Sequence, residues 1–265
     1  MSIPNKMQVG DMGIGEAKCW ASCLGDCEGG MSGEHIVSQG LFKSEYVDVS
    51  GFHWCKNEVK RVGLASLTKN ALCRKHNSGL SNLDSVAAHA FNVLRDQAKL
   101  ANDRAKNPNQ KYRTVNLSLN ASLLERWLLK TLINVGYGGS LFIGPNSIRE
   151  GYPSDDLVRI AFGKTRFPEA NGLYVASKVG MSLNFSDTVQ IATLLKDDKY
   201  IQGGRFTFRG VYMFLDLVPG GLKVPFEAIP GMSVDWHYIT LSKPFKQFKA
   251  MLGNRVSHVV KFNWI

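Results

Sequence analysis

Two short segments of the chain carry residue types that together could do hydrolytic chemistry. Glu34 and His35 are adjacent, and Asn77 directly follows the pair Cys73-x-x-His76. A carboxylate and a neighbouring imidazole can hold a cation and activate a water molecule, provided that another element brings a third polar ligand opposite them. Asn77 is the candidate for this third group. The sequence therefore predicts a metal-assisted hydrolytic site beside a metal-binding knuckle.

The cysteines indicate a structural zinc ion. All five lie in the first 73 residues, at Cys19, Cys23, Cys27, Cys55 and Cys73. Structural zinc takes four Cys or His ligands, commonly from two knuckles that are distant in sequence, and an odd, crowded set of thiols fits a metal site better than a disulfide framework. We predict that the zinc ligands are Cys19, Cys23, Cys73 and His76, with Cys27 as the substitute in the first knuckle. Cys55 is expected to be a buried thiol.

The same segments resemble a known family. The matching stretches are Gly33-Glu34-His35-Ile36-Val37, Leu72-Cys73-Arg74-Lys75-His76-Asn77-Ser78 and Leu80-Ser81-Asn82-Leu83-Asp84. In this combination they are similar to zinc-stapled HNH nucleases of the ββα-metal class, over roughly residues 18 to 95. The resemblance implies that His35 is the general base, which takes a proton from water as the water attacks a phosphodiester. It also implies that Glu34 and Asn77 bind a catalytic Mg²⁺ or Mn²⁺ ion.

The chain departs from the family at the third motif position. That position falls on Ser85, so Asp84 or His89 would have to complete the ion site. Asp84 fits equally well as the acidic partner of Ser81 in a capping box at the start of a helix. The sequence leaves both roles of Asp84 open.

The sequence patterns around these residues predict helices and strands that form an α+β fold in two parts. We expect a flexible arm over residues 1–17, a zinc-stapled ββα-metal finger domain over 18–106, a linker over 107–113 and a separate α+β domain over 114–265. Apolar periodicity predicts helices over 82–106, 122–135 and 155–162, the second opening with a capping box from Ser122 to Glu125. Runs of β-branched and aromatic residues predict strands over 206–217, 222–226, 236–241 and 256–264.

The charge of the chain indicates a polyanionic partner. Its 265 residues carry a formal net charge of +10, which favours nucleic acid, and double-stranded DNA first. Basic residues near the site in sequence could contact phosphates: Lys43, Lys56, Lys60, Arg61, Arg74 and Lys75. No apolar run is long enough to span a membrane and no secretory signal is evident, so we expect a cytoplasmic protein with no membrane partner. A protein partner or a homodimer stays open.

Three functional hypotheses follow from these observations. The first is an HNH-type endonuclease that hydrolyses phosphodiester bonds in DNA with a divalent metal, a family activity common in bacterial and phage defence and in mobile elements. The second is a zinc-stapled nucleic-acid-binding protein without catalysis, in which Glu34 and His35 are structural. The third is a thiol-based redox sensor that uses the cysteines without zinc. Residues 114–265 would serve target selection, sensing or partner binding, and the sequence does not decide among these.

Overall fold

The structure is a computed structural model that describes residues 18–264 apart from 53, 56–57, 112, 170, 177–185, 219–246 and 253–255. It is a mixed α+β fold, as the sequence predicts. The expected arm over 1–17 and the strands expected over 222–226 and 236–241 lie outside the described residues. Of the other expected strands, the run 206–217 belongs to a hairpin of β9 (Tyr200–Phe208) and β10 (Val211–Asp216).

Three α-helices lie in the described part of the chain: α1 (Arg74–Lys106), α2 (Ala121–Gly136) and α3 (Asp155–Ala161). The sequence prediction placed the start of α1 eight residues too late. The first backbone N–H groups of a helix have no acceptor within the helix. In α1 these groups donate to an earlier loop: Arg74 donates to the carbonyl of Gly30 at 2.9 Å, and Lys75 donates to that of Glu28 at 3.2 Å.

Both predicted capping boxes are wrong. Ser81 lies inside α1, and its hydroxyl donates to the backbone carbonyl of Ser78 at 2.8 Å. Helix α2 is capped by Asn120, whose side-chain oxygen accepts from the backbone N–H of Leu123 at 3.0 Å. Glu125 is buried and accepts from the backbone N–H of Leu173 at 2.8 Å, so it does not reach back to the helix start.

Among the residues that the structure describes, the largest sheet has seven strands in the order β3-β2-β8-β9-β10-β7, with β6 added beside β9. Besides β9 and β10, its members are β2 (Tyr46–Ser50), β3 (Lys60–Gly63), β6 (Phe142–Ile143), β7 (Gly172–Ala176) and β8 (Thr188–Lys196). The tight β9–β10 turn contains Arg209 and Gly210, both with positive φ, which suits the twist of a two-residue hairpin loop. Strands from both sides of the expected linker at 107–113 therefore share this sheet.

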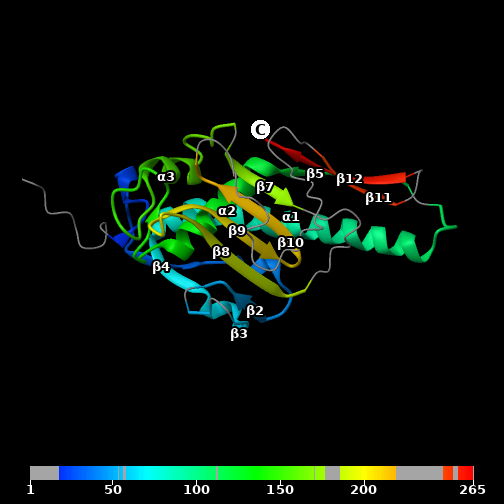
Figure 1. Ribbon diagram of the computed structural model, residues 1–265, viewed down its shortest axis with the longest axis horizontal. Coiled ribbons are helices and arrows are strands. Elements are labelled where there is room, and N and C mark those ends of the chain that lie inside the picture. The colour runs from blue at the N-terminus through cyan, green and yellow to red at the C-terminus, as the bar shows by residue number, and fades with distance from the viewer. Residues whose placement is uncertain are drawn as a thin grey trace, which may run out of the picture.

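Two smaller sheets lie in the described part of the chain. Strand β1 (Met31–His35) pairs antiparallel with β4 (Thr68–Cys73), which runs directly into α1. Strand β12 (Val256–Asn263) pairs with β11 (Gln247–Leu252) and, in parallel, with β5 (Asn116–Asn120). Short 3-10 turns lie at Ser22–Leu24, Gln39–Leu41 and Leu64–Ser66. Figure 1 shows α1 running past the seven-stranded sheet toward β11 and β12, which it contacts.

The core forms where α1 and α2 meet the seven-stranded sheet. Phe91 of α1, Trp127 of α2 and Phe208 of β9 pack with ring centroids 5.2 to 6.1 Å apart, and all three side chains are buried. The apolar face expected on α1, including Ala87, Ala90 and Leu94, is buried in the same cluster. The core thus joins residues before and after 107–113 and packs α1 and α2 against the seven-stranded sheet.

Candidate metal centre

Strand β4, helix α1 and the N-terminal segment bring a cluster of metal-ligand side chains together at the junction of β4 and α1. Cys73 is the last residue of β4, and His76 lies in the first turn of α1. Cys19 and Cys27 belong to the N-terminal segment, which is fixed to β4 by a backbone bond from Trp20 N–H to the carbonyl of Ala71 at 3.0 Å. We call Cys19, Cys27, Cys73 and His76 the Cys3His cluster.

The geometry of the Cys3His cluster fits a tetrahedral ion. Nδ1 of His76 lies 3.3 Å from Sγ of Cys19, 3.6 Å from Sγ of Cys27 and 3.2 Å from Sγ of Cys73. A zinc ion with ordinary Zn–S and Zn–N bonds would set such edges at about 3.6 Å. All four ligand atoms lie within 4.8 Å of one another, and in the described part of the chain this is the one such His, Cys and carboxylate group. The cluster could therefore hold a zinc-like ion.

Cys27 lies in the cluster and Cys23 does not, although the sequence predicts Cys23 as the ligand and Cys27 as its alternative. The 3-10 turn Ser22–Leu24 follows Cys19 at once and leaves Cys23 exposed, outside the cluster. Desolvation and the neighbouring Asp155 carboxylate raise the pKa of the Cys23 thiol to about 11. Such a thiol is mostly protonated near neutral pH, so Cys23 itself does not have the character of a reactive thiolate. Cys55 is buried elsewhere, with its sulfur 3.8 Å from the carbonyl oxygen of Val49.

An acidic side chain supports the imidazole from outside the cluster. Oδ1 of Asp26 lies 2.9 Å from Nε2 of His76, and Oδ2 of Asp26 lies 3.2 Å from Nζ of Lys75. The hydrogen bond with His76, followed by that with Lys75, lowers the pKa of the Asp26 carboxyl. A proton on Nε2 shared with this carboxylate leaves Nδ1 as the lone-pair donor toward the three sulfurs, the arrangement a metal-bound histidine needs.

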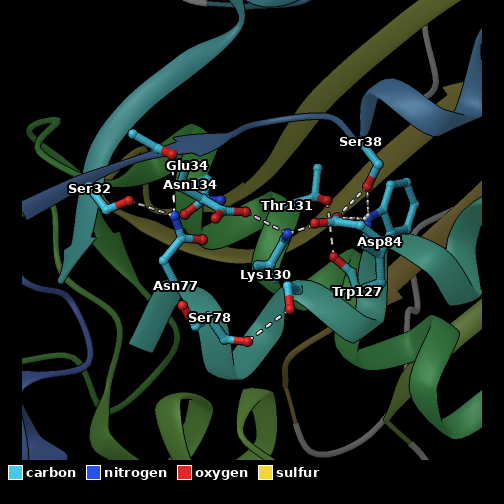
Figure 2. A network of polar contacts seen from close by, with 12 residues as sticks. Ser32, Glu34, Ser38, Asn77, Ser78, Asp84, Trp127, Lys130, Thr131 and Asn134 are labelled. Carbon is cyan, nitrogen blue, oxygen red and sulfur yellow. Dashed lines mark hydrogen bonds and ion pairs between the residues drawn. The ribbon is translucent and has the colours of Figure 1, made fainter. Parts of the chain in front are cut away.

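Asn77 directly follows His76 of the Cys3His cluster, whereas His35 lies at the opposite end of the β1–β4 pair from Cys73. His35 is the last residue of β1, pairs with Thr68 and is half-buried. Nδ2 of Asn77 donates to Oγ of Ser32 at 2.9 Å and to the carbonyl oxygen of Gly33 at 3.2 Å (Figure 2). The first turn of α1 is thereby tied to β1 two residues before His35. The structure brings these two predicted site residues onto neighbouring elements.

Glu34 is not arranged as the sequence led us to expect. Successive strand side chains face opposite sides, and Glu34 points inward, where it is 3 % exposed. Its Oε1 lies 2.5 Å from Nζ of Lys130, and the same ammonium lies 2.8 Å from Oδ1 of Asp84 (Figure 2). Burial raises the pKa of the Glu34 carboxyl, and the Lys130 charge opposes this effect. Glu34 and Asp84 therefore converge on a lysine.

This arrangement does not fit the divalent ion that the family resemblance implies. Mg²⁺ normally keeps several water ligands, which an almost fully buried carboxylate cannot accommodate, and a neighbouring ammonium repels it. Ser85 and His89, the other third-ligand positions considered, are both exposed on α1. Lys130 is not among the site residues that the sequence predicts. The available signal was one lysine inside the apolar run Trp127-Leu128-Leu129-Lys130-Thr131-Leu132-Ile133.

Comparison of the chain with models of known families, with curated proteins and with solved structures finds no significant match. None of the described helices is long and apolar enough to cross a membrane.

Proposed function

We propose that the protein is a zinc-stapled hydrolase of the HNH, ββα-metal class that cleaves phosphodiester bonds in DNA, with His35 as the general base. One observation carries the proposal. An antiparallel strand pair, β1 and β4, leads straight into α1 with the Cys3His cluster at the junction. Asn77 directly follows a cluster residue on α1, and His35 ends β1, the strand that pairs with β4.

His35 has the position that the chemistry needs. It is half-buried at a strand end, so its imidazole is held by the fold and remains accessible to solvent. A neutral imidazole accepts a proton from water, the resulting hydroxide oxygen attacks phosphorus, the bond to the leaving oxygen breaks, and that oxygen takes up a proton from solvent water. Asn77 serves as a positioning residue, because its bonds to Ser32 and Gly33 fix the strand that presents His35. No step is assigned to an ion held by Glu34 and Asp84.

The charge distribution supports a nucleic-acid substrate. The chain carries a net charge of +10, and Arg74 is exposed in the first turn of α1 beside the Cys3His cluster. Earlier in the chain, Lys60 and Arg61 on edge strand β3 lie over the rings of Trp54 and Tyr46, at 6.0 and 5.9 Å from the ring centroids. Exposed cations of this kind contact phosphates, and exposed rings can stack on bases.

A second candidate function is nucleic-acid binding without catalysis. The pairing of Glu34 with Lys130 favours it, because the carboxylate that the family would use for an ion is already neutralised. In that case the Cys3His cluster only shapes a basic surface.

Cleavage assays separate the two candidates. Zinc-loaded wild type, His35→Ala and His89→Ala are compared on supercoiled plasmid and on linear and single-stranded DNA, with Mg²⁺, Mn²⁺ or chelator present. His89 is the matched control because it is an exposed histidine on α1. The proposal expects cutting by wild type and His89→Ala and a loss of at least a hundredfold in His35→Ala at unchanged zinc content. Binding by all three without cutting would favour the second candidate, and equal cutting by all three would remove His35 from the chemistry.

A further inference from the structure

The buried side chain of Lys130 occupies the position where two carboxylates meet. Its Nζ lies 2.5 Å from Oε1 of Glu34 and 2.8 Å from Oδ1 of Asp84, and its side chain is 1 % exposed. Each carboxylate comes from a different element, Glu34 from β1 and Asp84 from α1, and the lysine comes from α2. Figure 2 shows the ammonium lying between the two acids.

The oxygen of Asp84 that faces Lys130 already accepts other hydrogen bonds. Oδ1 of Asp84 also accepts from Nε1 of Trp127 at 3.2 Å and from the hydroxyl of Ser38. The same indole N–H lies 2.8 Å from Oγ of Ser38. Three donors already use the lone pairs of this one carboxylate oxygen. Each of these donors would have to move before the oxygen could bind a cation.

We infer that Lys130 is the resident cation of the Glu34–Asp84 pair, so that no divalent ion binds between these carboxylates and the pair locks β1, α1 and α2 together. Two acids that converge without a counter-charge would attract a divalent ion, and an ammonium already provides the charge here. The inference concerns the site of the proposed function but does not depend on cleavage. Lys130 is then a positioning residue, which fixes the strand that ends in His35.

Binding of Mn²⁺ tests this inference on the full-length, zinc-loaded chain. Free Mn²⁺ is counted by its electron paramagnetic resonance signal during titration of wild type, Glu34→Gln and Lys130→Met. Glu58→Gln is the matched control, because it removes an exposed acid paired with Lys60. We expect wild type, Glu34→Gln and Glu58→Gln to bind Mn²⁺ alike within twofold, and Lys130→Met to gain a site at least tenfold tighter. That gain should disappear when Glu34→Gln is added to Lys130→Met.

A measurement on the wild type alone covers the case in which a variant fails to fold. The indole N–H of Trp127 donates to Asp84, so Mn²⁺ bound between the carboxylates would abolish its nuclear magnetic resonance signal by paramagnetic relaxation. The inference expects that signal to survive at Mn²⁺ concentrations that saturate any surface sites. Loss of the Trp127 signal, or a wild-type Mn²⁺ site that Glu34→Gln weakens at least tenfold, would overturn it. Neither result depends on DNA cleavage, so failure of this inference and failure of the proposed function are distinguishable.

Discussion

Oδ1 of Asp26 lies 2.9 Å from Nε2 of His76, on the nitrogen that does not face the three cysteine sulfurs. Carboxylates in this position orient a histidine ligand and increase its basicity. We expect Asp26→Ala to weaken zinc binding by roughly tenfold to a hundredfold. Competition with a fluorescent zinc chelator measures the effect. Glu28→Ala is the control, since Glu28 is an exposed acid that contacts Lys75 at 3.9 Å. Equal zinc affinity of wild type and Asp26→Ala would deny Asp26 this role.

The identity of the fourth zinc ligand gives a second prediction. Cys27 lies in the Cys3His cluster, whereas Cys23 is exposed outside it. We expect Cys27→Ser to lose most of its zinc and to unfold at a lower temperature, because a structural zinc site contributes directly to folding. Cys23→Ser, the same substitution four residues away, should keep one zinc ion per chain. Elemental analysis and thermal unfolding of both variants decide this, and the reverse pattern would restore Cys23 as the ligand.

The buried ion pair predicts a non-additive effect on stability. Lys130→Met leaves Glu34 buried without its cation, a change that typically costs about 3–5 kcal/mol of unfolding free energy. Glu34→Gln should cost less, because Lys130 keeps Asp84 as a partner at 2.8 Å. The double variant should be less destabilised than the sum of the two single variants. Urea unfolding of the zinc-loaded proteins measures this cycle, and simple additivity would argue against a direct interaction.

The buried Glu34 carboxyl also predicts how stability changes with pH. Burial raises its pKa above 4.5, the ordinary value, despite the opposing charge of Lys130. Between the ordinary pKa of the unfolded chain and the raised pKa of the folded chain, the folded chain retains a proton that the unfolded chain has released. The contribution of Glu34 to stability therefore falls as the pH rises. Relative to Glu34→Gln, the unfolding free energy of wild type should therefore decrease from pH 4.5 upward and level off above the raised pKa. A flat difference, or one that grows with pH, would mean that the pKa is not raised.

Local sequence patterns predict the zinc knuckle and the helices. The choice between Cys23 and Cys27 and the start of α1 depend on structure that these patterns do not contain. The Cys73-x-x-His76 spacing is local, and it identified two members of the Cys3His cluster. The choice between Cys23 and Cys27 depends on the turn at Ser22–Leu24, which spacing alone does not reveal. The start of α1 at Arg74 depends on carbonyls of Glu28 and Gly30, more than 40 residues away in sequence.

The role of Glu34 could not be predicted from its neighbours in sequence. A Glu-His pair at a strand end is compatible with an ion site, and only the folded chain brings Lys130 of α2 to the carboxylate. The helix pattern of α2 was recognised by its apolar residues, in which a single lysine has no local partner. A charged residue within an apolar helix face needs a buried counter-charge. Such a lysine therefore predicts a buried acidic partner, but the sequence does not show which acidic residue it is.

Zinc X-ray absorption spectroscopy on the purified chain tests the central claim most directly, since the proposed site is organised around the Cys3His cluster. We expect one zinc ion per chain, with three sulfur ligands at about 2.3 Å and one nitrogen ligand at about 2.0–2.1 Å. The sulfur shell should fall to two in Cys27→Ser if that variant retains zinc, and stay at three in Cys23→Ser. Protein that is folded and active on DNA without zinc, or a zinc shell dominated by oxygen and nitrogen, would contradict the account.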